Sequence, residues 1–238
     1  LVGDQARGHD LDRDALAVAG ALDHEGAQVA AWCISLGVAG CILRYRHAPR
    51  YRHPVPLGDA QRAIRLVRTR AKEWHIRPDQ VGIMGFSAGG HLASTAGTHF
   101  DVGDPDAKDA VDRAGSRPDF MILCYPVITF TGEYAHKGSL KNLLGREPDP
   151  WLVEDLSNEK QVSPRTPPTF LFHTDADSGV LPENSVSFYL ALRRARVPAD
   201  LHIYERGRHG LGLAQSDEAL RTWPDLCARW LALRGWVK

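Results

Sequence analysis

The feature that most constrains this chain is a short glycine-rich stretch with a serine at its centre. It reads Gly-Phe-Ser-Ala-Gly-Gly-His over residues 85–91, follows the apolar run 81–84 and precedes a run of small residues. A G-x-S-x-G motif between a strand and a helix predicts a sharp, strained turn that lifts the Ser87 hydroxyl clear of a sheet. Side chains at Gly85 or Gly89 would collide with the neighbouring strand or helix, so these positions must stay small.

The same turn predicts a place where negative charge is stabilised. The backbone N–H of Ala88 would lie at the N-terminus of the helix, where it can face a developing oxyanion. A glycine-rich loop that merely contains a serine is the alternative interpretation. The strand before the motif and the helix after it make that alternative the weaker one.

Apolar strands alternate with amphipathic helices along most of the chain. Strands are expected at residues 38–45, 78–86, 120–125, 169–173 and 199–204, and helices at 24–36, 58–74, 182–195 and 217–233. This alternation predicts a mostly parallel sheet flanked by helices on both faces, which is a three-layer α/β sandwich. Before residue 24, only the weakly apolar run 15–19 suggests a short strand or helix.

No internal repeat or linker divides the chain, so residues 1–238 are predicted to form a single domain. Residues 127–168 separate two predicted strands and contain several prolines and short helical pieces. Such a length between strands indicates a cap-like insertion or binding loops. Residues 46–56 are proline-rich and basic and are expected to form a loop, and the polar segment 97–118 to form an exposed excursion.

Composition argues against several classes of partner. Lys plus Arg and Asp plus Glu both number 29, so the formal net charge is zero and favours neither nucleic acid nor an anionic membrane. No apolar run approaches the ~20 residues of a membrane span. The four cysteines are scattered, which favours buried thiols and a cytoplasmic, reducing compartment. Because the chain starts at Leu1, a secreted protein that has lost an N-terminal segment is the alternative.

Two further side chains are expected to activate Ser87, because a serine hydroxyl needs a base and the base needs an orienter. On such a sheet the acid and then the histidine follow the serine along the chain. Asp177 follows a late strand and precedes a helix, whereas the competing carboxylate, Asp175, is expected to cap the loop. His209 follows the last strand among glycines. His91 is expected to pack or hydrogen-bond locally.

Several short motifs carry a resemblance to a known family. They are His24-Glu25-Gly26, Leu43-Arg44-Tyr45-Arg46-His47-Ala48-Pro49, Asp59-Ala60-Gln61-Arg62-Ala63, residues 85–91, Tyr125-Pro126-Val127-Ile128, Gly138-Ser139, Asn142-Leu143-Leu144-Gly145, Pro182-Glu183-Asn184-Ser185 and His209-Gly210-Leu211-Gly212. In combination they resemble the esterase and lipase branch of the α/β-hydrolases, specifically acetyl-xylan-esterase-like carboxylesterases.

The resemblance implies the α/β-hydrolase fold and hydrolysis of carboxylic esters, often the deacetylation of sugars. It implies Ser87 as the nucleophile, His209 as the general base and Asp177 as its orienter. It implies neither a metal nor an organic cofactor, and the expected partner is a small-molecule or carbohydrate ester. Residues 125–145 are expected to line the substrate pocket.

The N-terminal part departs from that family. The family carries a glycine-rich loop shortly before the position of His24, and its N–H groups supply the first half of the oxyanion hole. Here the nearest glycine is Gly20, which we therefore take as the candidate donor beside Ala88. Little room precedes it for the usual first strands, so the N-terminal strands are expected to be truncated or altered. A missing strand would expose a sheet edge that a homo-oligomer could cover.

The expected function is therefore that of a serine carboxylic-ester hydrolase acting on short-chain acyl esters, with acetylated sugars or xylan as candidate substrates. Two rival functions are compatible with the same motifs. A serine peptidase of this fold usually brings a propeller domain, for which 238 residues leave no space. A catalytically impaired, hydrolase-like binding protein is supported only by the altered N-terminus, since losing one oxyanion donor typically costs ~10²–10³ in rate.

Overall fold

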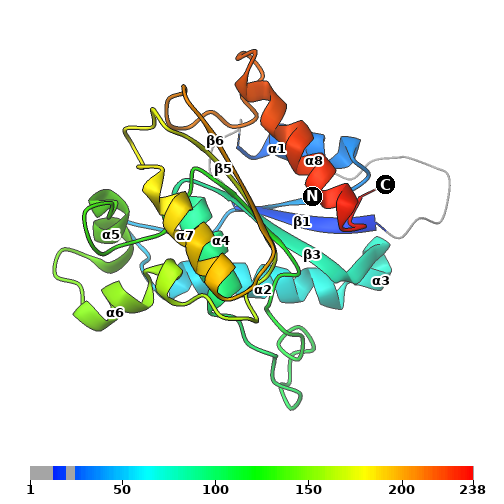
Figure 1. Ribbon diagram of the computed structural model, residues 1–238. Helices are drawn as coiled ribbons and strands as arrows, with labels where there is room; N and C mark the ends of the chain where they lie inside the picture. Colours follow the sequence, from blue (N-terminus) through cyan, green and yellow to red (C-terminus); the bar gives the residue numbers. More distant parts are fainter. Residues whose placement is uncertain (1–12, 20–24, 238) are drawn as a thin grey trace.

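The computed structural model describes residues 13–19 and 25–237, with side chains described from residue 25 onward. The strands are β1 (Arg13–Ala19), β2 (Ala39–Leu43), β3 (Ile76–Phe86), β4 (Met121–Cys124), β5 (Thr169–Thr174) and β6 (Ala199–Tyr204). Within the described residues they form one sheet in the order β2-β1-β3-β4-β5-β6, and every neighbouring pair is parallel (Figure 1).

Helices cover both faces of this sheet. They are α1 (Ala27–Ser35), α2 (Val55–Thr69), α3 (Ala71–Trp74), α4 (Ala88–Thr98), α5 (Lys137–Leu144), α6 (Pro150–Asp155), α7 (Glu183–Arg194) and α8 (Trp223–Leu233), with short 3₁₀ turns η1 (Asn158–Lys160) and η2 (Leu220–Thr222). Helices α1 and α8 pack on one face, and α2, α4 and α7 pack on the other (Figure 1). In the described part of the chain, no helix has both the length and the apolar character needed to cross a membrane.

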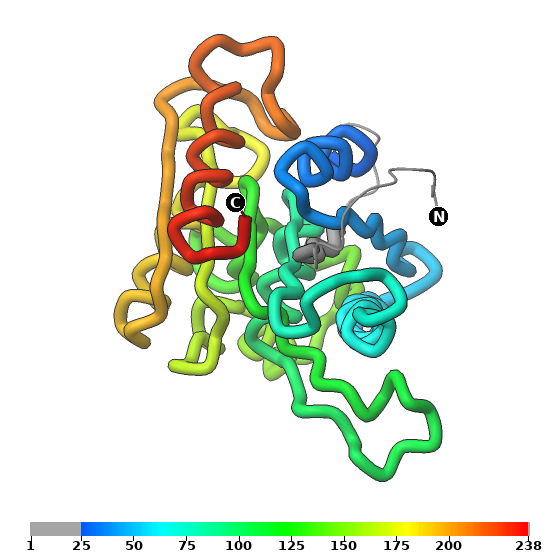
Figure 2. Tube along the Cα trace, turned by 90° about the vertical axis from the view of Figure 1, so that its right-hand side faces the viewer, coloured from blue at the N-terminus to red at the C-terminus, as the bar shows by residue number. Residues whose placement is uncertain are grey.

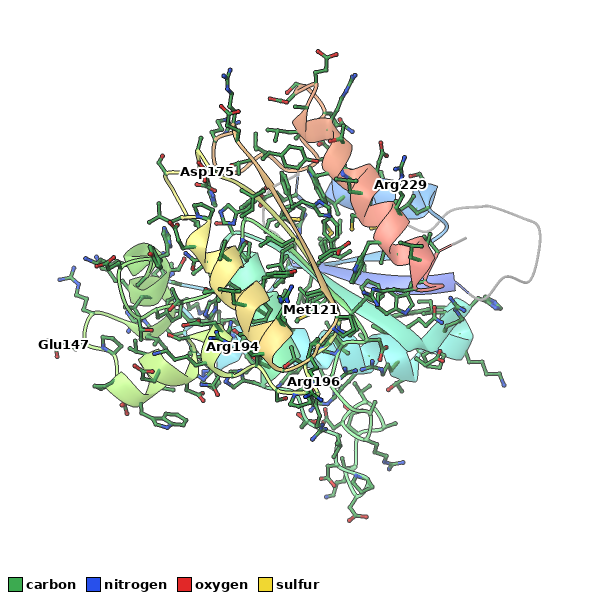
Figure 3. All side chains as sticks on the ribbon, viewed as in Figure 1. Met121, Glu147, Asp175, Arg194, Arg196 and Arg229 are labelled. Atoms are coloured by element: carbon green, nitrogen blue, oxygen red, sulfur yellow. The ribbon has the colours of Figure 1, made fainter. Side chains whose placement is uncertain are left out.

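The central strands are buried on both faces, as the near-continuous apolar runs predict. In β3, Met84 and Phe86 join the core beneath α1 and α8, whereas Val81 and Ile83 join the core beneath α2, α4 and α7. Met121 of β4 lies at the centre of the sheet (Figure 3) and is fully buried. The predicted three-layer sandwich is therefore confirmed.

Several boundaries differ from the sequence-based expectation, and the weak run before residue 24 proves to be a strand. The weak run at 15–19 belongs to strand β1, which pairs with both β2 and β3 inside the sheet. Helix α2 begins at Val55 rather than residue 58, because Pro56 fits the first helical turn, where no intrahelical N–H partner is needed. Helix α8 begins at Trp223 rather than residue 217, and Pro224 likewise fits its first turn.

The sheet order changes direction between β1 and β3. The chain moves from β1 outward to β2, returns to β3 on the other side of β1, and then continues through β4, β5 and β6. In open parallel sheets, ligands bind beyond the carboxyl ends of the strands at such a switch point. The segments that follow β3, β4, β5 and β6 all leave the sheet at this edge.

Two long connections extend from the body of the molecule. Residues 101–115 project as a largely exposed loop (Figure 2), and Arg62 on α2 holds it through Asp109 and Asp112. Residues 127–168 carry α5, α6 and η1, and they have a small apolar core that includes Phe130 and Leu156. The cap role assigned to residues 127–168 stays a prediction.

The stacked aromatic pair between β5 and α8 provides a test of the packing. Phe172 is fully buried and lies against Trp223 with ring centroids 4.9 Å apart and an interplanar angle of 11°. We expect Phe172→Ala to lower the free energy of unfolding by about 3–5 kcal/mol, because it removes buried area and leaves a cavity. Urea unfolding followed by tryptophan fluorescence measures this loss.

The matched control is Ile34→Ala on α1, since the Ile34 side chain is 63% exposed. This substitution should change the free energy of unfolding by no more than about 0.5 kcal/mol. A loss for Phe172→Ala that is no larger than the control's would contradict the packing described here.

Candidate active site

Ser87 occupies a strained turn between β3 and α4. Its φ of 52° and ψ of −119° lie in a region that non-glycine residues rarely adopt. Backbone hydrogen bonds hold the turn: the Ser87 N–H donates to Cys124 O at 3.0 Å, and Ser87 O accepts from the N–H groups of His91 and Val127. The turn predicted from the motif is therefore present, and β4 anchors it.

Close backbone approach explains the glycines around this serine. A Cβ atom on Gly85 would lie 2.1 Å from Gly89 O, so the helix could not begin where it does. A Cβ atom on Gly90 would lie 2.6 Å from the Cβ of Pro126, which follows β4. The motif predicted the first constraint, whereas the second depends on a segment remote in the chain.

The structure brings Ser87, His209 and Asp177 together from three separate loops. The distance from His209 Nε2 to Ser87 Oγ is 2.7 Å, and the distance from His209 Nδ1 to Asp177 Oδ2 is 2.6 Å. With Nδ1–H donating to the carboxylate, Nε2 is free to accept the serine proton. This is the geometry in which a histidine can act as a base toward a serine.

Asp177 is buried and held as an anion. Its Oδ1 accepts from the N–H groups of Gly179 and Val180 at 2.8 and 2.9 Å. Burial by itself raises the pKa of Asp177. The hydrogen bonds from His173, His209 and the Val180 N–H together lower it by more than burial raises it, so the pKa lies below its ordinary value. The carboxylate therefore carries negative charge beneath His209 at neutral pH.

The competing carboxylate does not enter this arrangement. Asp175 is exposed and lies at the surface of the molecule (Figure 3). Its backbone N–H donates to Tyr204 O at 2.7 Å, which continues the pairing of β5 with β6 for one residue. A separation of two positions along the chain, with Ala176 between them, is thus enough to distinguish a surface carboxylate from a buried one.

Sequence reasoning missed His173, which lies fully buried beneath the aspartate. Its Nδ1 is 2.7 Å from Ser185 Oγ, and its Nε2 is 2.9 Å from Val180 O and 3.5 Å from Asp177 Oδ2. The histidine thus supports both ends of the turn that carries the carboxylate. Its position near the end of an apolar strand, four residues before Asp177, is the signal that could have revealed it.

A second missed group surrounds Tyr125, which follows β4. The Tyr125 Oη donates to Glu25 Oε1 at 2.8 Å and accepts from the Gly212 N–H at 2.7 Å. Its ring lies edge-on to the His209 imidazole, with centroids 5.0 Å apart. Glu25, Tyr125 and Gly212 all belong to motifs that carried the family resemblance, but the motifs assigned them no role.

Of the two expected oxyanion donors, Ala88 lies within the described residues and Gly20 does not. Ala88 is the first residue of α4, so its N–H has no acceptor four residues earlier within the helix, and the residue is exposed. The prediction for Gly20 lies outside the described residues. Among the described residues, no three His, Cys, Asp or Glu side chains are grouped so that they could hold a metal ion.

A cavity of about 220 Å³ opens beside Ala88. Its lining residues are Tyr45, His47, Ala48, Tyr51, His53, Pro56, Leu57, Ala88, His91, Leu92, Thr95, Phe130, Ser139, Asn142, Leu143 and Leu156. The predicted 125–145 segment therefore contributes one wall. The proline-rich loop between β2 and α2 contributes another, which the sequence-based interpretation treated only as a connection.

His91 forms part of the floor of this cavity and packs locally, as expected. Its Nε2 is 2.9 Å from Leu156 O, and its ring stacks on Phe130 with centroids 4.4 Å apart. Burial lowers the pKa of His91 to about 4, although the Leu156 hydrogen bond opposes this effect. The side chain is therefore neutral at pH 7.

The buried neutral state of His91 predicts a pH dependence of stability. Between the ordinary pKa of 6.5 and a folded pKa of about 4, the unfolded chain binds this proton and the folded protein does not. Stability should therefore fall as the pH falls through this range, by up to roughly 3 kcal/mol for this group. His91→Gln should flatten the dependence, as measured by urea unfolding at pH steps from 7 to 4.

Ser94→Ala supplies the control, because Ser94 is buried in the same helix, bonds to His91 O and does not titrate in this range. It should lower stability by an amount that is independent of pH. Equal pH slopes for the parent protein and His91→Gln would rule out a buried neutral histidine.

The chain is similar to a known family and to several curated proteins. The model of the BD-FAE family matches residues 22–192. Endo-1,4-beta-xylanase B of Butyrivibrio fibrisolvens is 39% identical over 84% of this chain and 32% of its own length. The acetylxylan esterase of Xylanibacter ruminicola is 38% identical over 79% of this chain and 38% of its own length. The chain thus spans roughly a third of the length of these curated relatives.

Solved structures extend the similarity to nearly the whole chain. The acetyl ester-xyloside bifunctional hydrolase of Caldicellulosiruptor lactoaceticus is 46% identical, with a TM-score of 0.94, covering 98% of this chain and 87% of that one. An alpha/beta hydrolase enzyme from a deep-sea metagenome library is 26% identical, with a TM-score of 0.70, covering 93% and 84%. The chain therefore belongs to the BD-FAE family and has the α/β-hydrolase fold, and its resemblance to acetyl-xylan-esterase-like proteins is confirmed.

Proposed function

We propose that this chain is a serine carboxylic-ester hydrolase that acts on short-chain acyl esters, with acetylated sugars or xylan among its substrates. The observation that carries the proposal is the continuous hydrogen-bonded line from Ser87 through His209 to the buried carboxylate of Asp177. Relatives named as an acetylxylan esterase and an acetyl ester-xyloside hydrolase support the choice of ester over amide bonds.

The first half of the proposed reaction forms an acyl-enzyme. His209 Nε2 takes the proton of the Ser87 hydroxyl as Oγ attacks the ester carbonyl carbon. Asp177 holds the imidazole tautomer and stabilises the imidazolium, while the Ala88 N–H stabilises the oxyanion of the tetrahedral intermediate. The imidazolium then gives its proton to the leaving alcohol, and the acyl group stays on Ser87.

The second half releases the acid through the same groups. A water molecule gives a proton to His209 Nε2 as its oxygen attacks the acyl carbon. Collapse of the second tetrahedral intermediate breaks the bond to Ser87 Oγ, and the serine regains its proton from the imidazolium. Asp177 keeps its negative charge throughout, because the carboxylate stabilises the imidazolium and does not accept its proton.

The cavity beside Ala88 supports a small acyl group. Its deep part is closed by the buried side chains of His91, Phe130 and Leu156, and its wall on α5 presents Ser139 and Asn142. A small, mainly apolar pocket with a few polar groups at its side is typical of a site that binds a small ligand in one orientation. A long acyl chain would have to displace the buried floor.

A chain-length series tests both the reaction and the size of the pocket. We expect p-nitrophenyl esters to be hydrolysed fastest at C2–C4, and turnover to fall toward C12 because the cavity holds only about 220 Å³. Ser87→Ala should remove nearly all of this turnover, because the nucleophile is lost and only substrate binding and the oxyanion hole remain. Initial rates measured spectrophotometrically on the two purified proteins give the comparison.

The series also separates the rival functions. Turnover that equals that of Ser87→Ala for every ester would contradict the enzyme proposal and leave the hydrolase-like binding protein. Cleavage of aminoacyl p-nitroanilides at a higher kcat/KM than the esters would instead favour the serine peptidase.

The two nearby aspartates provide a matched pair of variants. Asp177→Asn should lower kcat by about 10⁴-fold, because the amide favours the wrong imidazole tautomer. Asp175→Asn should leave kcat within about twofold, since Asp175 is exposed and outside the hydrogen-bonded line. Steady-state kinetics with p-nitrophenyl acetate measures both, and comparable losses in the two variants would contradict the assigned orienter.

A further inference from the structure

We propose that Tyr125 is a positioning residue that ties the His209 loop to Glu25 and thereby keeps the base aligned with Ser87. The inference rests on the proposed function, because the alignment matters only if His209 acts on the serine. Neither Tyr125 nor Glu25 has a hydrogen bond to Ser87 among the described contacts, so their effect would pass through His209. We call the hydrogen-bonded set of Glu25, Tyr125 and Gly212 the tyrosine strap.

The loop that carries His209 needs an anchor. Residues 205–219 have no helix or strand, and Gly207, Gly210 and Gly212 all have positive φ values. Glycines cost more conformational entropy to order than other residues, so this loop gains little rigidity from its own backbone. Hydrogen bonds from neighbouring elements must therefore define where His209 lies.

The strap supplies such an anchor three residues after His209. The Gly212 N–H donates to Tyr125 Oη at 2.7 Å, and Gly212 O accepts from Trp223 Nε1 at 3.1 Å. Both backbone groups of one glycine are thus held by buried aromatic side chains, one from the loop after β4 and one from α8. The Tyr125 ring also contacts the imidazole directly, with centroids 5.0 Å apart.

Tyr125 is itself rigid enough to serve as a reference point. Its side chain is 1% exposed and packs against Phe86 and Phe172, with ring centroids 5.7 and 6.1 Å away. Its backbone has a φ of 37°, and its N–H donates to Phe172 O at 2.6 Å, which holds the strained conformation. The ring therefore has little room to move relative to β4 and β5.

Glu25 explains why this aromatic residue is a tyrosine. A phenol can donate one hydrogen bond and accept another, so Tyr125 Oη connects the Glu25 carboxylate to the Gly212 N–H. Burial raises the pKa of Tyr125 well above its usual range, and the Glu25 charge acts in the same direction, so the hydroxyl keeps its proton. A phenylalanine at this position could make neither the hydrogen bond to Glu25 nor the one from the Gly212 N–H.

The strap also joins distant parts of the carboxyl edge. Glu25 precedes α1 in the connection that follows β1, Tyr125 follows β4, and Gly212 belongs to the connection after β6. Ser87 lies between these strands, because β3 separates β1 from β4 in the sheet. The hydrogen bonds therefore reach across the serine from one side to the other, above a sheet that already holds Ser87 in place.

Three variants distinguish positioning from simple packing. Tyr125→Phe removes the hydroxyl, Glu25→Gln keeps an oxygen that can accept from Tyr125, and Tyr204→Phe is the matched control. Tyr204 also packs on Phe172, and its hydroxyl lies 2.8 Å from Thr222 Oγ1, outside the strap. Each protein is assayed with p-nitrophenyl acetate well below its melting temperature, and its far-downfield proton NMR signal from the His209–Asp177 hydrogen bond is recorded.

We expect Tyr125→Phe to lower kcat by about 10–100-fold with KM changed less than about threefold, because a displacement of about 1 Å can cost 10²-fold. Its downfield signal should broaden or vanish while the folded protein persists. Glu25→Gln should keep the signal and stay within about threefold of the parent kcat, and Tyr204→Phe should match the parent in both readouts.

Unchanged kcat and an unchanged downfield signal in Tyr125→Phe would overturn the inference, as would equal losses in Tyr125→Phe and Tyr204→Phe. A fall in melting temperature alone, with both readouts preserved, would also overturn it and leave a packing role. If the parent protein hydrolyses no ester, the proposed function fails. The NMR comparison then still decides whether the strap holds His209.

Discussion

The strained backbone at Ser87 is the constraint on which the rest of the site depends. A serine with a φ of 52° persists only because the surrounding structure determines it, through β3 before it, α4 after it and hydrogen bonds to the backbone of residues 124 and 127. The turn needs a central strand that cannot move, and a parallel sheet covered by helices on both faces provides one. Ser87 is therefore positioned by the core of the protein, while His209 and Asp177 come from loops.

The loops that carry these partners are held by buried polar groups rather than by regular structure. His173 supports the turn that carries Asp177 from below, and Tyr125 holds the loop that carries His209 from the side. Each of these polar groups is buried and paired, as a low-dielectric interior requires. The pKa of Asp177 is lowered and that of Tyr125 is raised, so a charged carboxylate and a protonated phenol can lie on either side of His209.

The cavity is likewise formed partly by packed core residues and partly by connecting segments. Its floor belongs to α4 and to the small apolar core of the 127–168 segment, and its walls belong to the β2–α2 loop and α5. The hydrogen-bonded line of Ser87, His209 and Asp177 and the shape of the cavity thus come from different parts of the chain, and Ala88, which follows Ser87, also lines the cavity. Substitutions in the walls can therefore change the shape of the cavity without disturbing the strained turn, in keeping with the wide range of functions found on common folds.

The sequence by itself determined the features that depend on residues close together in the chain or on a known order of motifs. These are the strained turn at Ser87, the alternation of strands and helices, and the succession of serine, acid and histidine. These follow from steric limits on adjacent residues and from hydrophobic periodicity, both of which can be read within a short window. It also favoured Asp177 over Asp175, a choice that depends on two positions in one loop.

Only the tertiary structure decided the contacts between segments that are remote in the chain. Tyr125 and Glu25 are 100 residues apart, and His209 and Ser87 are 122 apart. The sequence could suggest the second pair because a known motif order links them, but no such rule links the first. The role of His173 and the second wall of the cavity were likewise decided by packing, since the sheet order, and not the chain order, sets which loops meet.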